Sequence, residues 1–308
     1  MMLNQIAKGA LAVMLTGLVA TPMFAQLPEN LRDFPLAVRS AQGESVAPFF
    51  NGWIKNEDGS TTMIFGFANQ NREAVIDVPL GSNNFIEPAK YDGVQPTHFP
   101  VYNRGGFVGI QERGAFAITV PAEEAGTEVV WTLTSGGKTW SVPGRATSTA
   151  YEMSNGERAL GSLKPAIRFS MNGSESTSEE GIYAPRVTTS VGDPITLTAY
   201  VQDRGNRADY EDNKMLNYPL GTEWLMHQGP AAPDFSQALI TGRERAREGG
   251  ESGSSGNNGW EEVTTQATFS EPGDYIVRLR VDNFQAPDSQ FDNVCCWSNA
   301  YVPVSVTE

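Results

Sequence analysis

The sequence predicts an all-β protein of two β-sandwiches in series, and three observations lead to this prediction. Short segments that alternate apolar and polar residues recur along the chain, whereas segments with the helical period of about 3.6 residues are scarce. Turn-forming residues separate these segments, since the chain contains 31 Gly and 19 Pro. A length of 308 residues corresponds to about two domains.

Four segments in the first half have the period of two that strands show. They are residues 62–68, 74–78 and 115–120 and a hairpin over residues 128–142. Gly136-Gly137 separates the two apolar runs of the hairpin and is typical of its turn. These strands predict a β-sandwich over residues 44–146.

The second half shows the same alternation in residues 195–201 and 275–281. Within the latter segment, four apolar side chains share one face: Tyr275, Val277, Leu279 and Val281. Arg278 and Arg280 lie on the opposite face. Residues 300–306 form the last strand, where Pro303 removes a ladder donor and so favours an edge strand or a bulge. Residues 237–247 form one short helix.

The remaining segments define the predicted organisation of the chain. We expect an N-terminal extension over residues 26–43, a weakly patterned linker over residues 147–164 and a second sandwich over residues 165–308. Residues 81–100 and 202–260 contain loops longer than a compact sandwich needs. Loops of this length are functional or disordered.

Residues 191–199, Trp224 and residues 269–282 carry a resemblance to a known family. The first segment is similar to the second strand of immunoglobulin-like domains of the polycystic-kidney-disease (PKD) type, and Trp224 to the core tryptophan of their third strand. The third segment resembles their most recognisable stretch. The resemblance implies an immunoglobulin-like sandwich that serves as a spacer, adhesion or ligand-binding module of a secreted bacterial protein. We therefore predict two immunoglobulin-like β-sandwich domains in series.

The sequence departs from this family in two places. Where the family usually has an Asp-Phe-Gly-Asp-Gly-like turn after Trp224, residues 225–230 read Leu-Met-His-Gln-Gly-Pro. Residues 284–299 form a long insertion before the last strand. These two regions are where this chain is expected to differ from the family. The N-terminal half resembles no family that we can name.

Residues 1–25 have the features of a cleaved signal peptide. They contain one base, Lys8, and no acid, and an apolar run over residues 9–20 precedes the small residue Ala25. The apolar run is too short to span a bilayer, and we expect no transmembrane segment after cleavage. The predicted location is therefore the periplasm or the outside of a bacterial cell.

Charge and cysteine content exclude several classes of protein. The formal net charge of -14 argues against a nucleic-acid partner, which requires a basic surface. Two cysteines are too few for a disulfide scaffold or a zinc-finger array. The sequence contains no Gly-x-Ser-x-Gly elbow, no His-Glu-x-x-His and no phosphate-binding Gly-rich loop. Paired carboxylates of a glycosidase leave no such signature, so an enzyme stays open as the less favoured class.

Cys295 and Cys296 are adjacent and are the two cysteines of the chain. In an oxidising compartment they can form a vicinal disulfide, which rigidifies a tight turn and presents a flat sulfur surface for a sugar or an aromatic ligand. The alternatives are two thiols on opposite faces of a strand, an intermolecular bond or, with less support, a redox-active pair.

The acids and histidines have a functional and a structural interpretation each. Asp282, Asp288 and Asp292 supply the hard oxygen ligands that Ca²⁺ prefers, but they fit no fixed calcium-loop spacing, and a solvated acidic face is the alternative. No other cofactor is predicted. His98 and His227 are candidates for a ligand site, whereas local hydrogen bonds are the structural alternative.

Aromatic residues beside predicted loops are further candidates for ligand binding. We select Trp53, Phe99 and Trp297, together with the two histidines, as candidate ligand-binding residues; the alternative is that the aromatic rings fill the cores. The sequence thus predicts an exported, non-catalytic binding or adhesion module of the bacterial envelope or secretome. Its partner would be a glycan or an envelope protein. The alternative is a secreted hydrolase or an accessory subunit of one.

Overall fold

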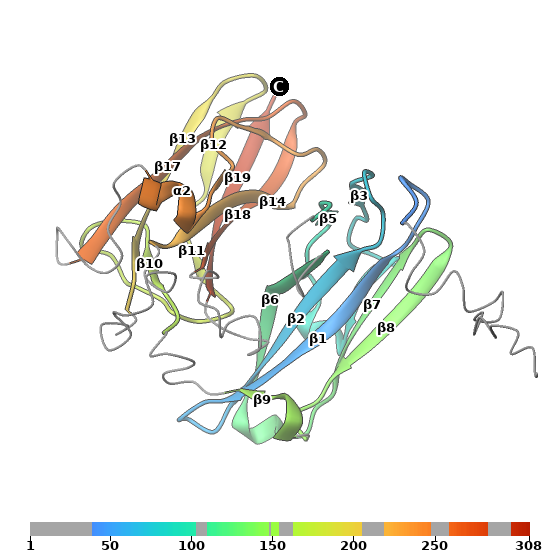
Figure 1. The fold of residues 1–308 in the computed structure, drawn as a ribbon. Helices are drawn as coiled ribbons and strands as arrows, with labels where there is room; N and C mark the ends of the chain where they lie inside the picture. Colours follow the sequence, from blue (N-terminus) through green and yellow to red (C-terminus); the bar gives the residue numbers. More distant parts are fainter. Residues whose placement is uncertain are drawn as a thin grey trace, which may run out of the picture. The chain divides into compact units, whose positions relative to one another are not determined.

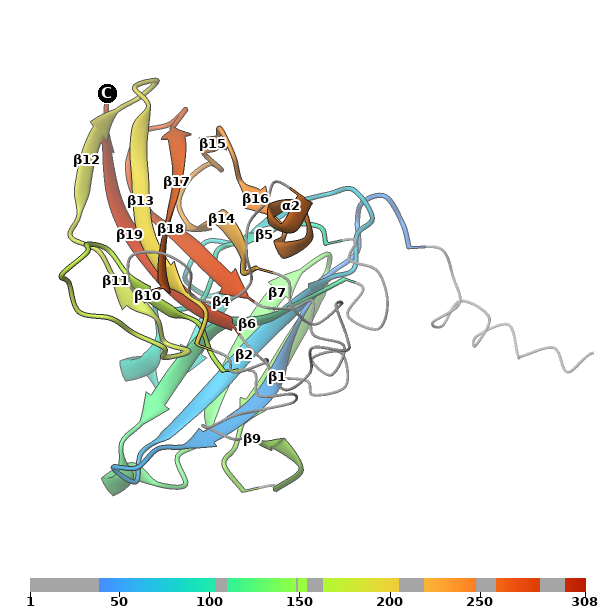
Figure 2. The same cartoon turned by 60° about the vertical axis from the view of Figure 1, so that its left-hand side comes forward.

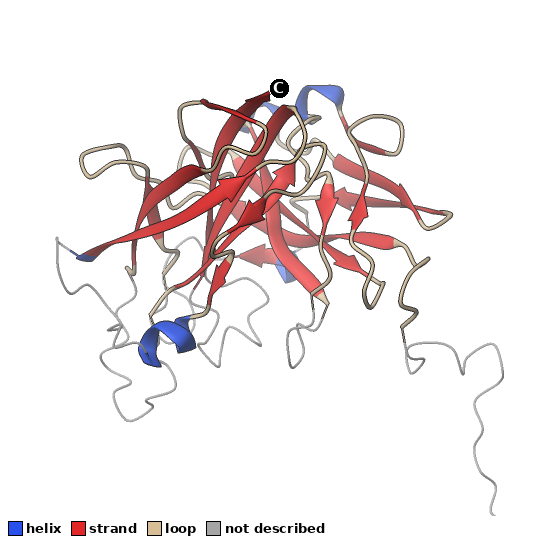
Figure 3. Cartoon of the chain, turned by 90° about the horizontal axis from the view of Figure 1, so that it is seen from above, coloured by secondary structure: helices blue, strands red, loops and turns tan. Residues whose placement is uncertain are grey.

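Strands make up nearly all of the regular structure in the computed structural model (Figure 3). The structure describes residues 39–102, 110–147, 149–153, 163–204, 219–247, 259–282 and 297–308. Helical segments in these residues are short: η1 (Ala89–Tyr91), η2 (Ala122–Glu124), η3 (Thr149–Tyr151) and α2 (Gly242–Arg247). None of the helices described here is long and apolar enough to cross a membrane. The predicted signal peptide and the cysteine pair lie outside the described residues.

The first sandwich consists of two facing sheets and a small two-stranded ladder. One sheet has the order β6-β2-β1-β9, with β1 (Val46–Lys55), β2 (Thr61–Asn69), β6 (Gln111–Val120) and β9 (Glu152–Met153) (Figure 1). The facing sheet contains β4 (Asn84–Glu87), β7 (Val129–Ser135) and β8 (Lys138–Gly144). The ladder pairs β3 (Ile76–Asp77) with β5 (His98–Phe99).

The core of this sandwich surrounds Trp131 on β7, which is completely buried. Its ring meets the ring of Phe116 edge to face at 5.0 Å, and its Nε1 donates to Asn84 Oδ1 at 3.0 Å. The β7–β8 hairpin closes at Gly136 and Gly137, whose φ values of 53° and 71° suit a two-residue turn. The hairpin and its glycine turn are therefore confirmed.

The second sandwich also has two sheets, which form its two layers in Figure 2. One has the order β10-β13-β17-β15, with β10 (Ala166–Arg168), β13 (Ile195–Gln202), β15 (Asp234–Phe235) and β17 (Trp260–Thr268). The other contains β11 (Ile182–Tyr183), β12 (Val187–Ser190), β14 (Gly221–Gln228), β16 (Leu239–Ile240), β18 (Gly273–Asp282) and β19 (Trp297–Thr307).

Strand order assigns the immunoglobulin-like fold to the second sandwich. Its strands β10, β13 and β17 share one sheet, whereas β14, β18 and β19 form the core of the other. Trp224 is buried on β14, and the hydroxyl of Tyr275 donates to the carbonyl oxygen of Glu271 at 2.7 Å, as in the tyrosine corner of such domains. In the first sandwich β1, β2 and β6 are separated from β4, β7 and β8 in the same way. The predicted fold class is therefore confirmed.

Three local predictions differ from the structure. The helix predicted over residues 237–247 is limited to α2, and the strand predicted over residues 74–78 is limited to β3. The strand β19 is not an edge strand, because β18 pairs with it on one side and β11 and β12 on the other. Pro303 is tolerated because β11 pairs with Ala300 and Tyr301 and β12 pairs from Val304 onward, so neither needs its missing N–H.

Candidate functional site

The most irregular point of the first sandwich is a bulge in β6, formed by Arg113, Gly114 and Ala115. These three residues face the single residue Gly66 on β2, since the pairing passes from Phe116 directly to Glu112. A Cβ on Gly66 would lie 2.3 Å from the carbonyl oxygen of Glu112, so the close approach of the two strands requires glycine. The bulge releases backbone groups from the β-ladder and turns them toward other partners.

Side chains of the second sandwich satisfy the carbonyl groups of the bulge. Arg280 Nη1 donates to the oxygen of Arg113 at 2.7 Å, and Asn299 Nδ2 donates to that of Gly114 at 3.0 Å. Arg278 donates to the oxygen of Ala115. Three consecutive buried acceptors of one sandwich are thus paired by β18 and β19 of the other.

An ion cluster lies beside the bulge. The side chains of Glu112 and Arg280 are 0% exposed and that of Arg278 is 1% exposed. Glu112 Oε1 accepts from Arg280 Nη1 at 2.8 Å and also from Arg278. Asp282 Oδ2 lies 3.2 Å from Arg280 Nε and adds a second acid to the two bases. Because buried ions lose their hydration, this cluster is stable only while its members stay paired.

Trp297 supplies the apolar part of the same contact. It is 2% exposed and packs against Ile54, Ile64 and Ala117 on the outer face of the β1–β2–β6 sheet. Gly114 has φ +61°, and a Cβ there would lie 1.9 Å from Trp297 Nε1. The guanidinium of Arg280 lies 5.4 Å from the centroid of the Trp297 ring, within the range of a cation–π contact. Glycine at position 114 therefore lets the indole reach the bulge.

A second contact joins residues 93–97 of the first sandwich to the end of β14. Thr97 N donates to His227 O at 2.8 Å, and His227 Nε2 lies 2.8 Å from Val94 O. Gln228 Nε2 donates to Gly93 O and to Gln95 O at 2.9 and 2.7 Å. Part of the loop predicted over residues 81–100 thus has a docking role.

The environment of His227 suppresses its positive charge. Burial lowers the pKa of its imidazole to about 3, and the nearby charge of Arg278 acts in the same direction. The ring is therefore neutral at physiological pH, and its Nε2–H donates to the carbonyl of Val94. It meets the ring of Tyr301 at 5.1 Å. Burial also raises the pKa of the Tyr301 hydroxyl above its usual value.

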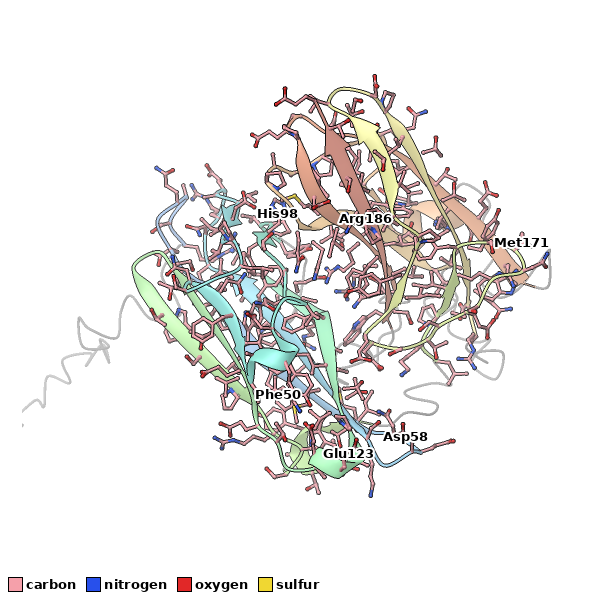
Figure 4. All side chains as sticks on the ribbon, turned by 180° about the vertical axis from the view of Figure 1, so that it is seen from behind. Phe50, Asp58, His98, Glu123, Met171 and Arg186 are labelled. Carbon is pink, nitrogen blue, oxygen red and sulfur yellow. The ribbon has the colours of Figure 1, made fainter. Side chains whose placement is uncertain are left out.

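The structure brings two predicted ligand residues, His227 and Trp297, to the contact between the sandwiches. The other three lie in the first sandwich. Phe99 is fully buried in its core and Trp53 is 8% exposed. His98, labelled in Figure 4, lies on β5 with Nδ1 2.7 Å from Asp77 Oδ1. The ring of Phe50, also labelled there, packs 5.4 Å from that of Phe65.

The predicted calcium ligands and cysteines are only partly described. Asp282 pairs with Arg280, whereas Asp288, Asp292, Cys295 and Cys296 lie outside the described residues. In the part of the chain that the structure describes, no three His, Cys, Asp or Glu residues gather as a metal site would require. Sequence reasoning missed Glu112 entirely. Its one signal was the pair of arginines that alternate with the apolar residues of β18.

Comparisons with known proteins give distant likenesses only. No protein-family model matches the sequence, and no curated protein matches it. The D00–D0 domain of Intimin is similar with a TM-score of 0.26 and 10% identity, over 86% of this chain and 100% of that chain. Domains 4 and 5 of the S-layer protein SbsC give 0.22 and 12%, over 86% and 98%. PapD-like domain 7 of human CEP192 gives 0.27 and 12%, over 54% and 99%. The fold assignment rests instead on strand order.

Proposed function

We propose that this chain is an exported, non-catalytic binding or adhesion module of the bacterial envelope or secretome, in which two immunoglobulin-like sandwiches act as one rigid unit. The buried cluster of Glu112, Arg278 and Arg280 carries the proposal. These three side chains are the most deeply buried charged groups of the described residues, and they join β6 of the first sandwich to β18 of the second. A module whose two sandwiches keep a constant separation loses less conformational entropy when one partner binds to both sandwiches.

Two finer parts of the proposal rest on sequence. The signal-like residues 1–25 support export to the periplasm or the cell exterior. Residues 191–199 and 269–282 support a PKD-type identity for the second sandwich. In this family comparison His227 and Gln228 belong to the segment that departs from the usual turn. They also contact residues 93–97 of the first sandwich, so the segment that differs from the family is the one that contacts the other sandwich.

Cys295 and Cys296 enter the proposal as a vicinal disulfide that stiffens the segment before β19. Formation of the bond removes two hydrogens and requires an oxidant such as the dithiol oxidases of the periplasm. Intact-mass analysis of the exported chain without reductant should give a mass lower by about two hydrogens than after reduction. Full labelling of two thiols in the untreated native protein would contradict the bond.

The test of the function is saturable binding of the purified exported chain. It should be retained by a component of a glycan array or of an isolated envelope fraction, and should turn over neither chromogenic glycosides nor esters. A Cys295→Ser/Cys296→Ser variant measured in parallel reports whether the pair contributes. Absence of saturable binding to both sources would overturn the proposal. Turnover of a glycoside or an ester that persists through purification of the chain would overturn it in favour of a hydrolase.

A further inference from the structure

The outer face of β13 and β17 in the second sandwich carries a regular array of polar side chains. We define the threonine face by the outward side chains of β13 and β17: Thr196, Thr198, Tyr200, Glu262, Thr264 and Gln266. They form three directly opposed pairs, Thr196 with Gln266, Thr198 with Thr264 and Tyr200 with Glu262. Each row is about 14 Å long, and the strands lie about 4.8 Å apart, so the side chains form a flat grid.

The hydroxyl groups at the centre of this grid are free to bind a ligand. In the described part of the chain, the hydroxyls of Thr198 and Thr264 make no hydrogen bond, although the two residues are directly opposed. Opposed hydroxyls elsewhere in the protein do bond to each other, at 2.8 Å for Thr132 and Ser141 and at 2.9 Å for Thr134 and Thr139. The pair on the threonine face therefore keeps its donors and acceptors available.

Few charged side chains lie on this face. Tyr200 is opposed by Arg168 on β10 and by Glu262 on β17, and its hydroxyl donates to Glu262 Oε2 at 3.0 Å. One base and one acid thus flank the tyrosine, and Asp234 on β15, directly opposite Thr268, adds one further acid at the end of the face. The single excess acid disfavours an anionic partner, and the hydroxyls that make no hydrogen bond match a neutral partner rich in hydroxyl groups.

We propose that the threonine face binds a neutral polysaccharide chain lying along β13 and β17. The threonine hydroxyls and the amide of Gln266 hydrogen-bond to sugar hydroxyls, and the partly buried ring of Tyr200 packs against a sugar face. This inference rests on the proposed binding function and names the class of ligand. It places the ligand on the second sandwich, away from Trp53 and Phe99.

Native affinity electrophoresis of the full exported chain tests this proposal. The gels contain a neutral polysaccharide (dextran, galactomannan or laminarin) or, for comparison, anionic polygalacturonate. We expect at least one neutral polysaccharide to retard the chain and polygalacturonate not to. Thr198→Val/Thr264→Val removes both hydroxyls with little change in shape and should weaken retardation about tenfold, as should Tyr200→Ala. Thr188→Val, at an exposed position on β12, is the matched control and should have no effect.

The outcomes separate this inference from the broader function. Retardation that the face variants leave unchanged, or retardation by polygalacturonate alone, overturns the threonine face while the binding module stands. Saturable binding of an envelope protein without any neutral glycan has the same consequence. Binding of neither class overturns both proposals. Circular dichroism of each variant, compared with the unaltered chain, verifies that a lost interaction reflects the surface and not unfolding.

Discussion

Glu112 on β6 and Arg280 on β18 are completely buried, and their Oε1 and Nη1 atoms lie 2.8 Å apart. They belong to different sandwiches and are separated by 168 residues in the sequence. The pair therefore joins two sandwiches that follow each other along the chain. Its stability depends on every member of the cluster, because a buried ion without its partner keeps the cost of lost hydration.

Replacing Glu112 by Gln should strongly destabilise the protein. The amide cannot neutralise Arg278 and Arg280, and Asp282 pairs only with Arg280, so the two buried cations keep one acid between them and the free energy of unfolding should fall by about 3 kcal/mol. Equilibrium denaturation in urea measures this loss. Glu123→Gln, at the exposed position labelled in Figure 4, should change it by less than about 0.5 kcal/mol. Equal stability of the two variants would contradict a structural role for the cluster.

Replacing Gly114 by Ala should displace Trp297. The added Cβ would lie 1.9 Å from the indole nitrogen, and the residue has φ +61°. Gly137 is the matched control, because it has φ +71° with nothing within 4 Å of an added Cβ. Both variants acquire similar backbone strain, but Gly114→Ala should lose about 1–3 kcal/mol more in thermal or urea unfolding. A Gly137→Ala variant that is equally unstable would show that the indole contact is not tight.

His227 should make stability depend on pH. Burial holds its pKa at about 3 in the folded state, below the value of 6.5 expected after unfolding. Above pH 6.5 both states are neutral, and the contribution of the neutral ring is complete. As the pH falls from 6.5 toward 3 only the unfolded state takes up the proton, so stability decreases by up to about 1.4 kcal/mol per pH unit.

Substitution separates this effect from the titration of carboxylates. His227→Gln retains a donor for Val94 and should flatten the fall in unfolding free energy between pH 7 and pH 5, measured in urea. His98→Gln alters the other histidine of the chain and should leave the slope in place. A slope that persists in His227→Gln would assign the pH dependence to other groups.

Removal of the Tyr275 hydroxyl should cost about 1 kcal/mol. This hydroxyl donates to the carbonyl of Glu271 at 2.7 Å at a sheet corner, and in Tyr275→Phe that acceptor loses its partner. The matched variant is Tyr200→Phe. The hydroxyl of Tyr200 donates at 3.0 Å to the exposed carboxylate of Glu262, which water can solvate after the substitution. Its unfolding free energy should change by less than about 0.5 kcal/mol. Identical effects in both variants would argue against a tyrosine corner.

Much of the fold could be predicted because its determinants are local. The alternation in β18 placed Tyr275, Val277, Leu279 and Val281 on one face, and all four are buried in the second core. Gly136 and Gly137 adopt the positive φ values that the hairpin requires. Both signals depend on neighbours within a few residues, so the sequence pattern contains them directly.

The docking contact could not be predicted in the same way. Periodicity put Arg278 and Arg280 on the outer face of β18, but it does not report that another sandwich covers this face. In the sequence Glu112 has no feature that separates it from the other acids. Its position is special because the bulge at residues 113–115 follows it, and this bulge depends on pairing with β2. His227 and Trp297 were predicted as ligand-binding residues, but the contacts they make are with partners more than a hundred residues away.

The bulge of β6 has a consequence for how such a protein can evolve. Its carbonyl groups are satisfied by side chains from β18 and β19, so the first sandwich on its own would present them as a free strand edge, which invites pairing between chains. Exchange of one sandwich by recombination would therefore succeed only if the new partner brought its own donors for Arg113, Gly114 and Ala115. Each sandwich has the strand order of a complete domain, yet three carbonyl groups of one depend on side chains of the other.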